Sequence, residues 1–286
     1  MISPTGYAIA NVAGILSLIS CIFVNYLILK HSHLRNNIEG KHIFILLTFY
    51  IFISFSTIIP YFTESEHSGP MCRVQGMLIQ FFNLNSILWT GYLTLYRYYD
   101  TILNKKVFDY KKTLVVIICI SILSSIIPFA IEMDAYGQGP TWCWYNRKKK
   151  VSFNILIYMC YYGIAWVVII WITYVFTYMI YQLKVKGVEA YRISYYKYFP
   201  IILVIFFLPL TLSRIVQSSN EHISPDPDSH EDFYGYFIFS ACLKRLLGLF
   251  TSLVYGLNPE MRAVLERRHN NDIIEIELKP ARISQI

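Results

Sequence analysis

Charged residues are scarce in this sequence of 286 residues: they make up 15% of it, whereas soluble globular proteins usually carry about 25%. Hydrophobic residues make up 55%, and the long apolar runs contain almost no Asp or Glu. This composition argues against a water-soluble fold. The net charge of +7 does not indicate a nucleic-acid-binding protein, because the basic residues lie in short segments between apolar runs.

Motifs of the common enzyme classes are also missing. The sequence contains no HExxH, no CxxC pair, no GxxxxGK[ST] and no GxSxG. An intramembrane protease would need paired aspartates or a Ser–His pair inside the apolar runs, and the acidic residues lie outside them. His31 and His33 invite a metal-site interpretation, but a loop beside basic residues explains them better. The sequence therefore predicts a protein that is not an enzyme and that uses no cofactor or metal.

Long apolar runs predict an all-α membrane protein with seven transmembrane helices. A spanning helix needs ~20 mostly apolar residues, and these runs are too long and continuous for the strands of a barrel. The predicted spans are Tyr7–Leu29, His42–Tyr61, Arg73–Tyr99, Thr113–Ile131, Val151–Leu183, Phe199–Gln217 and Phe233–Leu257.

The distribution of Lys and Arg predicts the orientation of the chain. The segments 30–41, 97–112, 184–197 and the tail from residue 258 hold 17 of the 25 basic residues. The opposite loops hold only the cluster at 147–150, which is the one discordant feature. The positive-inside rule therefore places the N-terminus outside and the C-terminus in the cytoplasm, in a multi-pass protein of the plasma membrane.

Two regions follow from this topology. Residues 1–257 form the seven-span core, and residues 258–286 form a short cytoplasmic tail. Asn258 and Pro259 suit the start of a helix, because Asn caps the free N–H groups and Pro lacks one. The spacing that follows predicts a short amphipathic helix along the inner leaflet, although a disordered tail is the alternative.

Two of the six cysteines lie on the outer side in this topology. Cys72 is at the start of the third predicted span, and Cys143 is in the loop between the fourth and fifth spans. Because the outer side is oxidising, we expect a disulfide between them, with two free thiols as the alternative. The bridge would hold that loop, with Trp142 and Trp144, over the bundle.

Apart from Arg97 at the inner end of the third span, four cations lie inside the predicted spans, where charges are costly and usually functional. Arg73 and Arg214 are near outer ends, whereas Lys244 and Arg245 are near the middle of the seventh span. Adjacent residues of a helix point about 100° apart, so Lys244 and Arg245 cannot both face one point. No acidic residue lies well inside a span to neutralise them. They suggest a small anionic ligand in a cavity open to the outside, and snorkelling toward Tyr and carbonyl groups is the alternative. Gln80 either lines that cavity or bonds between helices.

Three patches resemble a known family. The stretch Cys72-Arg-Val-Gln-Gly-Met-Leu-Ile-Gln80-Phe-Phe-Asn-Leu-Asn-Ser-Ile-Leu-Trp89-Thr is similar to the third helix of the slime-mould cyclic-AMP receptor and receptor-like family of G-protein-coupled receptors. The motif Trp142-Cys143-Trp144 and the ending Val254-Tyr-Gly-Leu-Asn258-Pro resemble that family as well. The resemblance implies a receptor that binds an extracellular ligand and a cytoplasmic heterotrimeric G protein.

The position of Arg97, at the cytoplasmic end of the third span, resembles that of the Arg in the acid-Arg-Tyr switch of rhodopsin-like receptors. Tyr96 stands where that switch has its acid, and no Asn-Pro-x-x-Tyr ends the seventh span, so the switch is not intact. We expect Arg97 and nearby basic residues to meet the G protein, and an ordinary positive-inside anchor is the alternative. The residues expected at this surface are Arg97, Lys105, Lys106, Lys184 and Lys186.

The sequence thus predicts a cyclic-AMP-receptor-like G-protein-coupled receptor for a small anionic ligand. The residues expected at the ligand site are Arg73, Gln80, Trp142, Trp144, Arg214, Lys244 and Arg245. A retinal photoreceptor is one alternative, because Lys244 is near the middle of the last span, but the third span carries no acidic counterion. A seven-helix transporter is the other, although no repeat relates the two halves of the chain.

Overall fold

The computed structural model of the protein describes residues 4–62, 70–105, 109–131, 135–138, 143–145, 159–185, 198–223, 231–256, 258 and 261–262. These residues form helices and one small hairpin. In chain order the elements are α1 (Pro4–Lys30), α2 (Ser32–Asn36), α3 (Ile38–Phe62), α4 (Pro70–Tyr98), the π-helix η1 (Tyr99–Leu103), α5 (Tyr110–Ile131), β1 (Tyr136–Gln138), β2 (Cys143–Tyr145), the π-helix η2 (Met159–Gly163), α7 (Ile164–Val185), α8 (Tyr198–Ile223) and α9 (Glu231–Gly256).

Seven of the described helices have 22 or more residues, and they coincide with the seven predicted apolar runs. By length and hydropathy five described segments could cross a bilayer: Ala8–Lys30, Ile38–Ile58, Tyr110–Ile131, Met159–Val185 and Gly235–Gly256. In α8 the apolar stretch Pro200–Val216 is shorter, and α4 carries several amide side chains. The chain is therefore a nearly all-helical, multi-pass membrane protein.

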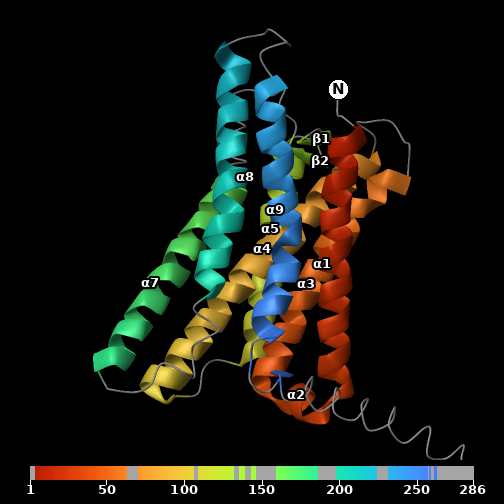
Figure 1. The fold of residues 1–286 in the computed structure, drawn as a ribbon. Coiled ribbons are helices and arrows are strands. Elements are labelled where there is room, and N and C mark those ends of the chain that lie inside the picture. Colours follow the sequence, from red (N-terminus) through yellow and green to blue (C-terminus); the bar gives the residue numbers. More distant parts are fainter. Residues whose placement is uncertain are drawn as a thin grey trace, which may run out of the picture.

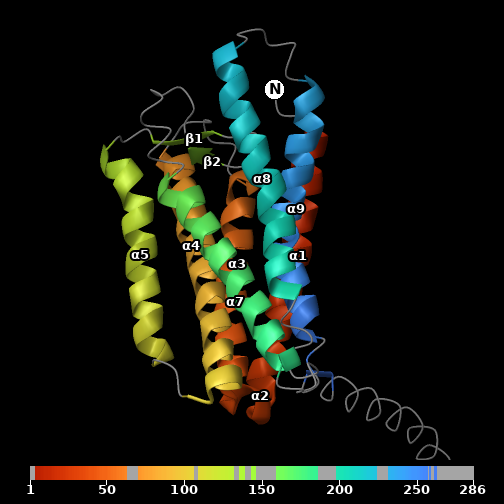
Figure 2. The ribbon, with the colours of Figure 1, turned by 90° about the vertical axis from the view of Figure 1, so that its left-hand side faces the viewer.

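Helix α4 lies at the centre of the bundle, which explains its polar composition. It contacts α3, α5, α7 and both strands, whereas α1 packs mainly on α3 and α9 (Figures 1 and 2). Helix α8 runs beside α9, and α5 lies at the edge of the bundle beside α4 (Figure 2). Gln75 and Gln80 bond to neighbouring elements, and the other buried polar side chains of α4 donate to carbonyls of α4 itself. Because these groups have partners inside the bundle, α4 tolerates residues that a lipid-facing helix would not.

Lipid-facing helices show the opposite pattern. Large apolar side chains on α5 and α7 point outward, including Val115, Leu123, Val167 and Ile170, which are 60%, 61%, 69% and 64% exposed. An apolar surface of this kind is unfavourable in water, but it is compatible with the hydrocarbon layer of a bilayer.

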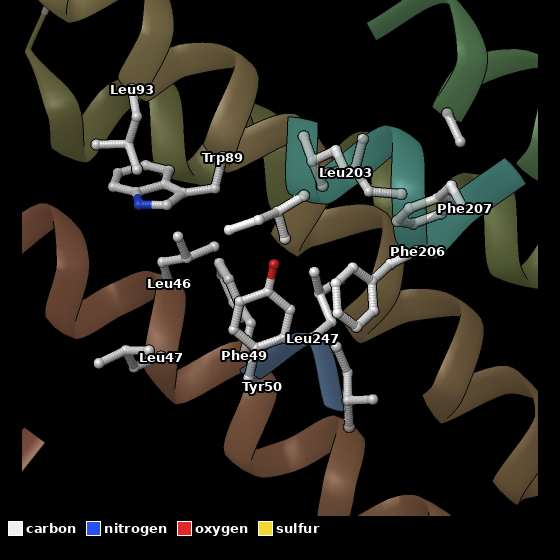
Figure 3. Close-up of a cluster of buried hydrophobic side chains, with 14 of the residues drawn as sticks. Leu46, Leu47, Phe49, Tyr50, Trp89, Leu93, Leu203, Phe206, Phe207 and Leu247 are labelled. Atoms are coloured by element: carbon white, nitrogen blue, oxygen red, sulfur yellow. The ribbon is translucent and has the colours of Figure 1, made fainter. Parts of the chain in front are cut away.

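The core between the helices is aromatic and aliphatic. Figure 3 shows Tyr50 of α3, Trp89 of α4, Phe207 of α8 and Leu247 of α9 converging on one cluster. Beside this cluster α9 comes very close to α1 and α3 at Gly248. A Cβ there would collide with Ser17, and it would lie 2.9 Å from Sγ of Cys21 and 3.1 Å from Cβ of Tyr50. Only glycine allows this approach.

The two ends of the bundle differ in what they contain. At one end lie the start of α1 and the β1–β2 hairpin, which we call the hairpin end (Figure 1). At the opposite end lie α2 and the C-terminal end of α9, which we call the α2 end. After α9, the backbone N–H of Arg262 donates to the carbonyl of Asn258 at 2.9 Å, as in the first turn of a helix. The predicted amphipathic helix otherwise lies outside the described residues.

Candidate functional site

A disulfide joins Cys72 to Cys143 at the hairpin end, which confirms the predicted pair. It connects the first turn of α4 to β2, whose residues pair in antiparallel register with β1. The sequence did not predict this hairpin, since strands of three residues carry too little periodicity to be recognised. The hairpin is thus attached covalently to the central helix.

Gln75 holds the same strand by hydrogen bonds. Its side-chain oxygen accepts from the backbone N–H of Cys143 at 3.1 Å, and its Nε2 donates to the carbonyl of Ser56 at 2.7 Å. All three residues are buried. One amide therefore connects α4 with both α3 and β2, one turn below the disulfide.

Gln80 anchors the other strand. The hydroxyl of Tyr136 lies 2.8 Å from Oε1 of Gln80 and 2.8 Å from the carbonyl of Ser125, and Nε2 of Gln80 donates to the carbonyl of Ser124 at 2.9 Å. A Cβ at Gly76 would lie 2.7 Å from the ring of Tyr136, so glycine gives the tyrosine its space. Of the two roles considered for Gln80, bonding between helices is the one observed.

Trp144 extends the hairpin into the bundle. Its side chain is buried, and its ring meets Tyr161 of η2 edge-on with centroids 5.2 Å apart. Such edge-to-face contacts are favourable beyond simple burial. Trp142, the other predicted tryptophan, lies outside the described residues. Arg73 is only half buried at this end.

The two adjacent cations of α9 point to different neighbours. Arg245 is buried, and its guanidinium donates to the side-chain oxygen of Asn11 on α1. Lys244 is 7% exposed, and its Nζ lies 3.5 Å from the ring centroid of Phe207 on α8. Adjacent helical residues point about 100° apart, so this divergence is what the sequence predicted. Nζ of Lys244 has no hydrogen-bond partner among the described residues.

Arg214 lies in the same contact between α8 and α9 as Lys244. It is buried, and its guanidinium carbon lies 4.7 Å from the ring centroid of Phe237. The hydroxyls of Ser213 and Ser240 come within 3.3 Å of each other across the contact. We call these residues of the two helices, with Phe207 and Lys244, the α8–α9 seam.

At the α2 end Arg97 forms an ion pair with Glu39 of α3. Asn258, just after α9, also donates through Nδ2 to Oε1 of Glu39 at 3.2 Å. The sequence did not indicate either partner of Glu39. The available signal was that Glu39 is the one acidic residue in the basic segment 30–41. Glu39 therefore connects α3 with α4 and with the residue that follows α9.

One turn beyond Glu39, His42 is buried among aromatic rings. Its ring meets those of Trp89, Tyr92, Tyr96 and Tyr110 edge-on, with centroids 4.8 to 5.7 Å apart. Its carbonyl accepts from the indole N–H of Trp89 at 2.9 Å. This packing fixes the position of the α3 segment that presents Glu39 to Arg97.

Of the remaining basic residues predicted at the α2 end, the structure describes Lys105 and Lys184, and neither side chain forms a hydrogen bond or ion pair with this network. Lys105 and Lys184 are exposed, as expected for residues that could meet a partner or lipid headgroups. Lys106 and Lys186 lie outside the described residues.

Comparisons with known proteins agree with this architecture. No family model matches the sequence. The chain is 25% identical over 204 residues to cyclic AMP receptor-like protein A of Dictyostelium discoideum. The aligned region covers 70% of this chain and 50% of that protein. The chain thus spans about half the length of that relative. The crystal structure of squid rhodopsin superposes with a TM-score of 0.66 at 15% identity, over 92% of this chain and 84% of that one.

These similarities establish the fold of a G-protein-coupled receptor and confirm the resemblance to the cyclic-AMP-receptor-like proteins. Together with the long apolar helices, they support a multi-pass protein of the plasma membrane.

Proposed function

We propose that the chain is a seven-span G-protein-coupled receptor with its hairpin end outside the cell and its α2 end in the cytoplasm. The observation that carries this proposal is the ion pair of Arg97 with Glu39 at the α2 end, opposite the disulfide-anchored hairpin. A disulfide persists on the oxidising side of a membrane, and basic residues concentrate on the other side. Both rules give the same orientation.

The proposed signal is an extracellular small molecule, and its candidate contacts are the residues predicted from the sequence: Arg73, Gln80, Trp142, Trp144, Arg214, Lys244 and Arg245. An anionic molecule suits the excess of cations among these residues. The name of the similar Dictyostelium protein, cyclic AMP receptor-like protein A, makes cyclic AMP the first molecule to test. The side chain of Gln80 already bonds Tyr136 and Ser124, so its role would be to hold the hairpin above the ligand.

The proposed output is activation of a heterotrimeric G protein at the α2 end. Its candidate contacts are Arg97, Lys105, Lys106, Lys184 and Lys186. While Glu39 pairs with Arg97, the guanidinium is occupied. A partner that binds Arg97 must compete with Glu39, and an agonist that favours the open arrangement makes this competition easier. The two sites are then coupled reciprocally.

A nucleotide-exchange assay tests this function. Membranes containing the full chain are mixed with purified heterotrimeric G proteins, and cyclic AMP and other small acids are added one at a time. We expect at least one acid to accelerate exchange, with no acceleration in membranes that lack the chain. Substrate flux into reconstituted vesicles without any exchange would instead establish a transporter.

Lys244 keeps the retinal photoreceptor as a second candidate, since its amine has no hydrogen-bond partner among the described residues. A retinal Schiff base is usually protonated beside an acid, and no Asp or Glu occurs in 70–98 or 233–256. A visible absorption band after addition of retinal to the purified chain would decide for this candidate.

A further inference from the structure

We infer that Lys244 is the residue that binds a ligand's oxyanion, within the α8–α9 seam, and that its neighbour Arg245 is a structural clamp between α9 and α1. The biological meaning of this inference rests on the proposed receptor function. Both residues are predicted from the sequence as ligand contacts, and this assignment keeps that role for Lys244 and withdraws it for Arg245.

The case for Lys244 begins with its missing partner. It is 7% exposed, it lies in the middle of a helix that is long and apolar enough to cross a bilayer, and its Nζ has no hydrogen-bond partner among the described residues. Its contact is the face of the Phe207 ring, at 3.5 Å from the centroid. A ring face attracts a cation but does not replace the hydrogen bonds that an ammonium group makes in water.

The helices place few carboxylates near Lys244 in the sequence. Glu39 of α3 pairs with Arg97 at the α2 end. The other acids of the long helices are Glu221, near the end of α8, and Glu231 and Asp232, in the first turn of α9 and at least 12 residues before Lys244. A charge at the centre of a spanning helix is costly, so an anion from outside the chain would relieve that cost.

The surroundings of Lys244 suit an oxyanion. Phe237, Ser240 and Lys244 share one face of α9, since they are three and seven residues apart. That face meets Arg214 and Ser213 of α8. A carboxylate, sulfate or phosphate group has several acceptor oxygens, and Lys244 offers it an ammonium without a hydrogen-bond partner among the described residues. Arg214 adds a second positive charge farther along the seam, beside Phe237, while the hydroxyls of Ser213 and Ser240 donate to carbonyls of their own helices. Charge-assisted hydrogen bonds between an ammonium and an oxyanion are about twice as strong as neutral ones.

Arg245 faces the other way. Its guanidinium donates to Asn11 of α1, and a Cβ at Gly14 would lie 3.8 Å from its Cδ, so its stem runs along α1. Asn11 is itself buried. The partner of Arg245 therefore belongs to the fold, whereas the partner of Lys244 does not.

Thermal unfolding of the purified full chain in lipid nanodiscs tests the inference. The probes are acetate, sulfate, inorganic phosphate and pyrophosphate, titrated against chloride at constant ionic strength. We expect at least one oxyanion to raise the Tm of the wild type. Lys244→Met should lose this shift or raise the apparent Kd at least about tenfold, which corresponds to about 1.4 kcal/mol. Lys244→Arg should retain the shift.

Matched variants distinguish anion binding at the α8–α9 seam from a general effect of the protein's positive charge. Lys111→Met removes an exposed lysine by the same chemical change and should respond to the anion as the wild type does. Arg245→Gln should lower the Tm without anion but keep a positive anion shift. Lys244→Met should remain folded, because replacing an uncompensated buried charge by an apolar group of similar size is often neutral or stabilising.

Three results would overturn the inference: no oxyanion raises the wild-type Tm, Lys244→Met keeps the full shift, or Lys111→Met loses it equally. The readout needs no G protein. If an anion raises the Tm but no acid accelerates nucleotide exchange, the receptor proposal is wrong and the anion site stands. If an acid accelerates exchange but no anion raises the Tm, the receptor proposal stands and the anion site is wrong.

Discussion

The two ends of the bundle are held together by bonds of very different strength. At the hairpin end a disulfide and buried hydrogen bonds of Gln75 and Gln80 fix the β1–β2 hairpin on α4. At the α2 end the aromatic rings around His42 also fix α3 on α4, but Arg97 is held by an ion pair with Glu39, and these two side chains are 16% and 14% exposed. Ion pairs that water can reach typically contribute up to about 1 kcal/mol. The hairpin is therefore attached covalently, whereas the ion pair can break at little cost.

Removal of the disulfide should have the largest effect, because it weakens the end of the bundle that is more strongly held. The double variant Cys72→Ser/Cys143→Ser should lose about 2–5 kcal/mol of stability, because the unfolded chain gains the freedom of a long loop. Thermal unfolding in nanodiscs and the yield of folded receptor measure this loss. Cys119→Ser, at an exposed thiol on α5, is the matched control and should change neither. A Tm equal to that of the control would show that the hydrogen bonds alone hold the hairpin.

Tyr136→Phe should have an intermediate effect. It removes a hydroxyl that lies 2.8 Å from both Oε1 of Gln80 and the carbonyl of Ser125, and it leaves these buried acceptors with fewer partners. Loss of a buried hydrogen-bond partner costs about 1–3 kcal/mol. The Tm should fall accordingly, whereas Tyr174→Phe, at a side chain that is 64% exposed, should leave it unchanged. Equal Tm values for the two variants would contradict a structural role for the network.

Glu39→Gln should have the smallest effect on stability and a clear effect on signalling. Its loss should cost less than about 1 kcal/mol, yet the same energy shifts an equilibrium between closed and open arrangements about fivefold. Nucleotide exchange without agonist should therefore rise by up to about fivefold. Asp100→Asn, which neutralises an exposed acid in η1, is the control. If Glu39→Gln shows normal agonist-driven exchange but no change in basal exchange, the ion pair does not restrain activation.

The sequence predicted the long helices well, because a bilayer demands long apolar segments whatever their partners are. It also predicted the pairing of Cys72 with Cys143, since both fall on one side of the membrane. It predicted that Lys244 and Arg245 diverge, because helix geometry alone requires it. The direction of each could not be predicted, since that depends on Phe207 and Asn11, which lie on other helices.

Contacts between distant segments were the main features that the sequence did not indicate. Glu39 and Arg97 are 58 residues apart, and nothing in the local pattern around either one identifies the other. The hairpin was missed for a related reason: its strands are stabilised by a disulfide and by amides of α4 rather than by their own periodicity. Gln80 was recognised as a polar residue of the interior, but its bonding partners required the fold.

The close approach at Gly248 marks the point where α9 lies nearest to α1 and α3. With Ser17, Cys21 and Tyr50 against the backbone there, α9 cannot come closer, so a tilt of α9 would turn about this contact. Lys244 lies four residues to one side of Gly248, and Gly256 lies eight residues to the other. At 1.5 Å per residue these arms are about 6 Å and about 12 Å long. A tilt that shifts Lys244 by about 1 Å toward α8 would carry the end of α9, next to Asn258, about 2 Å the opposite way.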